Sequence, residues 1–149
     1  MNYIGSKLSL LNFIESGIKS CVGSDLSNYS FCDGFAGTGV VGAHFKQQTK
    51  QIIANDNEYY SFILNKNLIC NNFDIRELIP TIEYIENFDI REGKIYKYYA
   101  AGGGNNRLYF TDYNAIKIDT YRQAIESIKK DIGEQKFFLL TSIIIRTSR

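Results

Sequence analysis

The feature that most constrains the fold is a glycine-rich turn that joins a short strand to a helix. Residues 29–33 have the composition of a strand, residues 34–39 (Gly-Phe-Ala-Gly-Thr-Gly) form the turn, and a helix is expected over residues 40–46. A second strand at residues 51–55 and a second helix at residues 57–71 follow directly. Because strand and helix alternate in such short units, the sequence predicts an α/β fold on a parallel sheet with right-handed crossovers.

The remaining expected elements are mainly helical. Apolar residues recur at three- and four-residue steps in three further segments, which we expect to be helices: residues 7–20 after the N-cap Ser6, 75–85, and 111–132 capped by Thr111. A last apolar segment, residues 137–145, is also expected to be a helix. Pro80 marks a break or a helix start. In the third segment the apolar steps are Ile118, Tyr121, Ile125, Ile128 and Ile132. Residues 88–110 lack this periodicity and contain a Gly-Gly-Gly-Asn-Asn run, so we expect an irregular segment with a flexible tip.

Composition limits the class of protein. The 149 residues, 44% of them hydrophobic and 22% charged, suit one ordinary folded domain. No apolar run approaches the ~20 residues that cross a bilayer, and the N-terminus lacks the layout of a signal peptide, so we expect a cytoplasmic protein with no membrane partner. Cys21, Cys32 and Cys70 form no CxxC pair and the single histidine, His44, offers no partner for a metal. Buried reduced thiols and no metal site are therefore expected.

Charge is distributed unevenly along the chain. Residues 1–90 contain six Lys/Arg and ten Asp/Glu, whereas residues 91–149 contain eleven and six, which gives net charges of −4 and +5. This asymmetry fits a cofactor-binding part at 1–90, followed at 91–149 by an irregular and helical part that faces a polyanion. Neither value is extreme, so chance would also account for it.

The glycine turn and the acid after the second strand have the chemistry of an adenosine-binding site. Glycines let backbone amides and a helix N-terminus approach a nucleotide-like ligand. Asp56 follows the second strand, 19 residues after Gly37, where a carboxylate can accept hydrogen bonds from two ribose hydroxyls.

Two cofactors fit this pattern. Residues 37–42 are a literal GxGxxG, which favours a dinucleotide such as NAD. Asp33 precedes the glycines, however, and its carboxylate would repel a pyrophosphate and attract a ligand that carries an ammonium and a sulfonium. A turn with a purely structural role is the third interpretation.

The residues from Asp33 to Gly39 (Asp-Gly-Phe-Ala-Gly-Thr-Gly) resemble the Asp-x-Phe-x-Gly-x-Gly cofactor motif of amino-methyltransferases. Three more stretches, residues 1–7, 55–62 and 107–122, are similar in the same order to bacterial site-specific adenine-N6 DNA methyltransferases of restriction–modification systems. The resemblance implies a Rossmann-like sheet, S-adenosylmethionine as cofactor and double-stranded DNA as substrate. It implies that Lys7 meets the cofactor carboxylate and Asp56 the ribose. The cofactor residues it implies are Tyr3, Lys7, Asp33, Phe35, Gly37, Gly39 and Asp56.

The aromatic block beside the glycine-rich tip has two interpretations. Arg107, Tyr109 and Phe110 would bind DNA phosphates and stack on a base, or they would form an aromatic edge of the core. The cations that follow are interpreted as one solvated helix face: Lys117, Arg122, Lys129 and Lys130. Without the resemblance, Lys7 would likewise be a solvated charge.

The catalytic motif of the resembled family is absent from these residues. That motif, Asp/Asn/Ser-Pro-Pro-Tyr/Phe/Trp, holds the weakly nucleophilic amino group of a flipped adenine. The chain has one proline, Pro80, so it contains no Pro-Pro pair. We therefore predict an incomplete methyltransferase sheet without catalytic residues, inactive alone, from a truncated or frameshifted gene or from a split enzyme whose second chain carries the motif. A dinucleotide-binding oxidoreductase-type module is the alternative outside the family.

Overall fold

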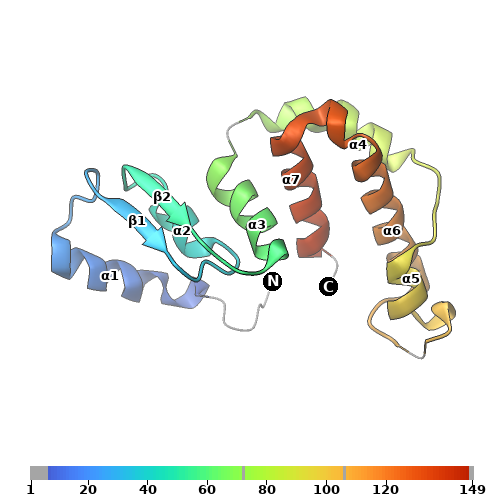
Figure 1. The fold of residues 1–149 in the computed structure, drawn as a ribbon, viewed down its shortest axis with the longest axis horizontal. Helices are drawn as coiled ribbons and strands as arrows, with labels where there is room; N and C mark the ends of the chain where they lie inside the picture. Colours follow the sequence, from blue (N-terminus) through green and yellow to red (C-terminus); the bar gives the residue numbers. More distant parts are fainter. Residues whose placement is uncertain (1–6, 72, 106, 148–149) are drawn as a thin grey trace. The chain divides into compact units, whose positions relative to one another are not determined.

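The computed structural model describes residues 7–71, 73–105 and 107–147 (Figure 1). Two predictions, Tyr3 as a cofactor residue and Ser6 as a helix cap, lie outside the described residues. The chain forms two compact units, residues 1–71 and residues 72–149. The functional boundary expected from charge lies instead at residue 90, and that division stays a prediction.

The first unit is a strand–helix–strand arrangement flanked by further helices (Figure 1). β1 and β2 run parallel, with Ser30 opposite Gln51 and Asp33 opposite Ala54. Its elements in chain order are the 3-10 helix η1 (Leu8–Leu10), α1 (Leu11–Val22), β1 (Ser30–Asp33), α2 (Val40–Phe45), β2 (Gln51–Ala54) and α3 (Tyr59–Cys70). The predicted order of strands and helices is confirmed, and in the described part of the chain the sheet has these two strands only.

One face of the sheet carries the core of this unit. Phe31 of β1 stacks on Phe45 of α2, with ring centroids 4.6 Å apart. Phe45 is fully buried together with its neighbours in the core, against which apolar side chains of α1 also pack. Because side chains alternate along a strand, Cys32 and Ile53 point to the opposite face, and both are exposed.

The prediction of buried thiols is wrong, because all three cysteines are exposed. Cys32 lies on the exposed face of the sheet, Cys21 lies near the end of α1, and Cys70 is the last residue of α3. Parallel sheets are normally covered on both faces. The described residues of this unit leave one face of the sheet open, which exposes Cys32.

The second unit is helical, and α6 is its central element, contacted by α4, α5 and α7. Pro80 lies in the first turn of α4, so it marks a helix start. The elements are the 3-10 helix η2 (Ile75–Leu78), α4 (Ile79–Glu86), α5 (Lys94–Tyr99), the 3-10 helix η3 (Ala101–Gly103), α6 (Asp112–Ser127) and α7 (Lys129–Thr147). The whole chain is thus a mixed α/β protein, mostly helical, with a small parallel sheet.

Two expectations for this unit are corrected. The segment expected to be irregular contains α5 and η3, and residues 91–105 and 107–110 are named the α5 loop below. The helix expected over 111–132 ends at Ser127, because Ile128 leaves the helical conformation (φ −104°, ψ 7°). A second interruption follows at Gly133 (φ 77°, ψ 164°), within α7. The cap at Thr111 is confirmed, since its side chain accepts a hydrogen bond from the N–H of Asn114.

None of the helices described here combines the length and the apolar character needed to span a bilayer.

Candidate functional site

The glycine turn lies at the carboxyl end of β1, and two of its glycines have conformations that other residues rarely adopt. Gly37 has φ +53° and Gly39, the N-cap of α2, has φ +79°. At Gly39 space is also restricted, because a Cβ atom there would lie 2.8 Å from Oδ1 of Asn65. The turn therefore requires glycine at position 37 because of the positive φ. At position 39 it requires glycine because of the positive φ and because Asn65 lies so close.

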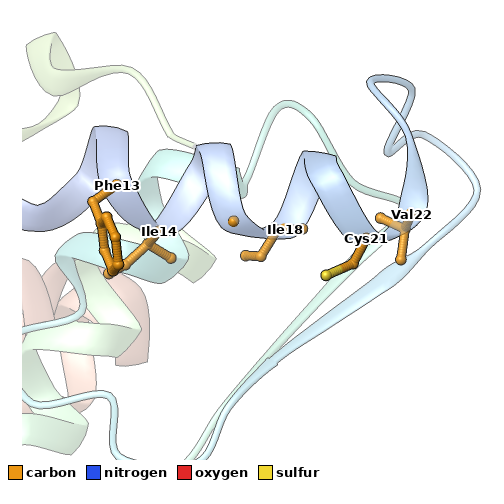
Figure 2. Close-up of a pocket in the computed structure, with 6 residues that line it drawn as sticks. Phe13, Ile14, Ile18, Cys21 and Val22 are labelled. Carbon is orange, nitrogen blue, oxygen red and sulfur yellow. The ribbon is translucent and has the colours of Figure 1, made fainter.

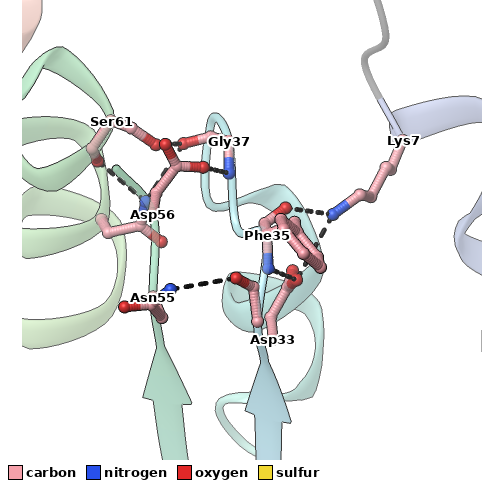
Figure 3. Close-up of polar contacts among 9 residues, drawn as sticks. Lys7, Asp33, Phe35, Gly37, Asn55, Asp56 and Ser61 are labelled. Atoms are coloured by element: carbon pink, nitrogen blue, oxygen red, sulfur yellow. Dashed lines mark hydrogen bonds and ion pairs between the residues drawn. The ribbon is translucent and has the colours of Figure 1, made fainter. Parts of the chain in front are cut away.

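Side chains from beyond β2 fix both polar groups of Gly37 (Figure 3). The N–H of Gly37 donates to Oδ2 of Asp56 at 2.7 Å. The carbonyl of Gly37 accepts from the hydroxyl of Ser61 and, at 3.1 Å, from the amide of Asn65, both on α3. The turn is thus held in one conformation by the segment that follows the second strand.

Asp33 and Lys7 form the charged side of the turn (Figure 3). The Nζ atom of Lys7 lies 3.3 Å from Oδ1 of Asp33 and donates to the carbonyl oxygen of Phe35 at 2.5 Å. Oδ1 of Asp33 also accepts from the N–H of Phe35 at 3.2 Å. Oδ2 of Asp33 is buried and has no hydrogen-bond partner among the described residues.

Asp56 is partly exposed and carries a full charge at neutral pH. Its Oδ1 accepts from the N–H of Glu58 at 3.0 Å, and its Oδ2 from that of Gly37. These backbone donors, that of Glu58 first, lower the pKa of the Asp56 carboxyl below its ordinary value. The side chain of Ser61 and the backbone of Asn57 also lower this pKa, so the ionised carboxylate is an acceptor with several donors around it.

The structure brings together most of the residues expected at the cofactor site. Lys7, Asp33, Gly37 and Asp56 lie around one turn, linked by hydrogen bonds (Figure 3). The backbone of Phe35 takes part, while its side chain is 86% exposed. Tyr3 lies outside the described residues.

Ser61 and Asn65 were missed from the sequence. Both are buried polar residues, four positions apart on one face of α3. Their spacing on a largely apolar helix is the signal that would have found them.

The residues expected to contact DNA lie in the α5 loop, and two of them share a neighbour. The guanidinium of Arg107 lies 5.6 Å from the centroid of the Tyr99 ring, and the rings of Tyr99 and Tyr109 are 5.9 Å apart. Tyr109 is 72% exposed. Phe110 is half-buried, and its N–H donates to the carbonyl of Tyr99. Tyr99, which the sequence did not single out, is thus the residue on which this group is built.

A second group of aromatic and cationic side chains lies on α6. The ammonium of Lys117 lies 5.7 Å from the ring centroid of Tyr113 and 5.5 Å from that of Tyr121. The hydrogen bond to Tyr121 raises the pKa of Lys117. Lys117 is exposed, as are Arg122, Lys129 and Lys130, in agreement with the predicted solvated face, and its ammonium also lies near two aromatic rings.

The boundary between the two units, at residue 71, does not coincide with the change in charge along the chain. Residues 1–71 contain five Lys/Arg and five Asp/Glu, and residues 72–149 contain twelve and eleven. The five acids within residues 74–89 belong to the second unit, so the asymmetry lies inside that unit and not between the two. Net charge of a unit therefore does not separate a cofactor part from a DNA part, and the argument for DNA rests on the α5 loop.

An apolar groove runs along α1 (Figure 2). It is lined by Phe13, Ile14, Gly17, Ile18, Cys21 and Val22. Phe13 is 78% exposed and Val22 is 39% exposed, which is unusual for apolar residues on one helix face.

A parallel strand–helix–strand unit with a glycine turn at the carboxyl end of its first strand is the arrangement with which α/β proteins bind nucleotide-like ligands. The fold and the turn place the first unit in that class.

Comparison with known proteins gives the family. Residues 3–142 match the family described as D12 class N6 adenine-specific DNA methyltransferase. The chain belongs to this family, as its motifs suggested. The dinucleotide-binding oxidoreductase alternative is not favoured by this match. No solved structure matches the chain.

Curated relatives agree with the family. The chain is 46% identical over 147 residues to type II methyltransferase M.NlaIII of Neisseria lactamica, 37% identical over 157 residues to M.FokI of Planomicrobium okeanokoites, and 32% identical over 147 residues to M.CviAII of Paramecium bursaria Chlorella virus 1. Each alignment covers 97% of this chain. The chain spans only 44%, 24% and 44% of these relatives' own lengths.

Proposed function

We propose that the turn between β1 and α2 holds S-adenosylmethionine for a site-specific adenine-N6 DNA methyltransferase. The observation that carries the proposal is Asp33: its carboxylate is buried at the end of β1, and Oδ2 has no partner among the described residues. A buried acceptor without a donor costs free energy, and the ammonium group of an amino-acid-like ligand is a suitable donor.

Lys7 complements Asp33 at the same end of the ligand. Its ammonium group has three N–H donors, of which Asp33 and the Phe35 carbonyl take two. The third is available to the carboxylate of the ligand. Lys7 and Asp33 together thus match the two opposite charges of an amino-acid end.

Asp56 would hold the other end of the ligand. Its ionised and partly exposed carboxylate would accept hydrogen bonds from two neighbouring ribose hydroxyls. When bound, S-adenosylmethionine supplies a methyl group on a positively charged sulfur. Asp33, Lys7 and Asp56 orient it, and Ser61 and Asn65 keep the turn in shape through Gly37.

The two strands would belong to a larger, Rossmann-like sheet, and polypeptide outside these 149 residues would complete that sheet. The exposed Cys32 and Ile53 leave one face of a parallel sheet open, and the groove on α1 leaves apolar surface in water (Figure 2). The same polypeptide, or a second chain, would supply the Pro-Pro motif that this sequence does not contain.

Double-stranded DNA would approach the α5 loop. Arg107 carries a charge that phosphate attracts, and the exposed ring of Tyr109 offers a surface on which a base can stack.

Calorimetric titration of the 149-residue chain tests the cofactor assignment. We expect binding of S-adenosylmethionine, weakened at least about tenfold by Lys7→Ala, since a charged hydrogen bond contributes roughly 1.5–3 kcal/mol. Lys50→Ala, an exposed lysine of the same unit, is the matched control and should bind as the wild type does. Tight binding of NAD with none of S-adenosylmethionine would overturn the assignment.

A radiolabelled methyl-transfer assay tests the missing motif. The chain alone should not methylate mixed-sequence DNA, because it lacks the Pro-Pro motif that is expected to hold the adenine amino group. Addition of the part of the Neisseria lactamica relative that the chain does not match should restore transfer and protect Cys32 from a thiol reagent. Turnover by the chain alone, or transfer without protection of Cys32, would contradict the proposal.

A further inference from the structure

Buried polar side chains hold the α5 loop to α6. Asp119, in the middle of α6, is only 4% exposed. Its Oδ1 accepts from the N–H of Ile95 at 3.1 Å and its Oδ2 from that of Tyr96 at 2.8 Å. These are amides of the first turn of α5, which have no acceptor within their own helix, so Asp119 caps α5 from a distant part of the sequence.

The neighbouring residues of α6 extend this attachment. The hydroxyl of Thr120 accepts from the N–H of Arg91 at 2.9 Å. Asp112, one residue into α6, accepts from the N–H of Gly102 at 2.8 Å. Three side chains of one helix thus bind the backbone of the loop at its start, at α5 and near its tip.

The fit at Asp119 is close. A Cβ atom at Gly93 would lie 2.7 Å from Cγ of Asp119, so only glycine allows the loop to approach the carboxylate in this way. The side chain of Asp119 is enclosed on the side of the loop and has no room to serve a ligand there.

The attachment continues to the exposed residues of the loop. Tyr99, the last residue of α5, accepts through its carbonyl from the N–H groups of Tyr109 and Phe110. Its ring lies beside Tyr109 and under the guanidinium of Arg107. The orientation of α5 therefore decides where Arg107 and Tyr109 are presented.

We propose that Asp119 is a positioning residue for DNA binding: by capping α5 it sets the place of Arg107 and Tyr109. The inference rests on the proposed role of these two residues in contacting DNA. The physical basis is entropic: side chains that are already ordered in the free protein lose less conformational entropy when they bind DNA.

Whether DNA affinity rises or falls when Asp119 loses its charge distinguishes a positioning role from simple electrostatic repulsion. Removal of a negative charge favours binding of a polyanion, so Asp131→Asn, an exposed acid of the same unit, should bind DNA as tightly as the wild type or slightly more tightly. Asp119→Asn removes the same charge, yet its amide places a donor against a backbone N–H. We expect it to weaken binding about tenfold, because one amide of α5 loses its acceptor.

Anisotropy titrations of a short labelled duplex with the 149-residue chain make the measurement, and hydrogen exchange at Ile95 and Tyr96 reports the cap itself. Asp119→Asn should lose exchange protection at both amides. The double variant Asp119→Asn/Arg107→Ala should bind more tightly than the sum of the two single losses predicts, because both changes remove the Arg107 contact. A merely structural role would leave the two losses additive.

The outcomes are distinct. Wild-type affinity in Asp119→Asn with lost exchange protection overturns the positioning role and leaves the DNA role of the loop intact. A wild-type chain that does not bind DNA, with the cap present by exchange, overturns the proposed DNA contact and with it this inference. If Asp119→Asn does not fold, Gly93→Ala displaces the loop without a change of charge and should weaken binding likewise; wild-type affinity there would also overturn the inference.

Discussion

Two carboxylates, Asp56 in the first unit and Asp119 in the second, perform the same local task in different surroundings. Asp56 accepts the N–H groups of Gly37 and Glu58, and Asp119 accepts those of Ile95 and Tyr96. Each carboxylate thereby fixes the backbone at the start of a helix or turn. They differ in exposure, since Asp56 is partly open to solvent whereas Asp119 is 4% exposed.

Exposure decides what else each carboxylate can do. The carboxylate of Asp56 is partly exposed, so a ligand can reach the group that orders the glycine turn, as the proposed contact with a ribose requires. Asp119 is enclosed by the loop that it orders, so it acts on any ligand only through that loop. A buried acid therefore points to a ligand only where an oxygen lacks a partner, as Oδ2 of Asp33 does, and not where backbone amides take both oxygens, as in Asp119.

The largest expected effect concerns Asp56. Asp56→Ala should lower the affinity for S-adenosylmethionine about a hundredfold or more, because it removes the ribose acceptor and the anchor of Gly37, each a charged hydrogen bond of roughly 1.5–3 kcal/mol. Calorimetric titration measures the change. Asp119→Asn, in the other unit, should leave this affinity unchanged, and so should Asp25→Ala, which removes an exposed carboxylate that caps a turn through Ser27. Wild-type affinity in Asp56→Ala would show that Asp56, like Asp119, does not contact the ligand directly.

Gly39 gives the next effect, on stability. Gly39→Ala should lower the free energy of unfolding by about 3 kcal/mol, because a left-handed backbone costs roughly 1–2 kcal/mol for alanine and Asn65 leaves no room for the methyl group. Gly104→Ala is the matched control, because Gly104 has nearly the same left-handed backbone (φ 81°, ψ 4°) and open space around it, and it should cost only the backbone part. Urea denaturation measures both. Equal losses would show that Asn65 does not restrict position 39.

The first unit could be predicted from the sequence because its signals are local. The strand, the glycines and Asp56 follow one another at fixed spacing, and the structure confirms the order of elements. The partners that hold Gly37 could not be predicted in the same way. Ser61 lies within the resembling stretch 55–62, but its contact with Gly37, like that of Asn65, forms only in the folded chain.

The second unit was predicted less well because its order comes from contacts between distant residues. Of the apolar stripe expected on α6, only Ile125 is buried, and the buried residues are Ala115, Asp119, Thr120, Ala124 and Ile125. Asp119 and Thr120 lie outside this stripe and are buried because they bind the backbone of the α5 loop. Hydrophobic periodicity cannot reveal an interface made of hydrogen bonds, so α5 was taken for irregular chain.

A smaller effect on stability tests whether α6 depends on its N-terminal cap, Thr111, as the α5 loop depends on Asp119. Thr111→Ala removes the side-chain acceptor for the N–H of Asn114 and should lower the stability of the second unit by about 1 kcal/mol. Thr111→Ser keeps the hydroxyl and should restore most of it. Chemical denaturation followed by circular dichroism is the measurement, and a loss of equal size in the serine variant would show that the cap is not the cause.

The smallest effect is the pH dependence that Asp56 confers. Its backbone donors lower its pKa in the folded chain, whereas an unfolded aspartate titrates near 3.8. Because the folded pKa is the lower one, the stability contributed by Asp56 is present above the unfolded value and is lost as the pH falls through the folded value. Asp56→Asn should therefore be less stable than the wild type at neutral pH, and the difference should shrink below about pH 4. Urea midpoints measured at several pH values for both chains test this. A difference that stays constant on acidification would mean that the folded chain does not favour the ionised form, and Asp56 would then lack the charge on which its proposed contact with the ribose depends.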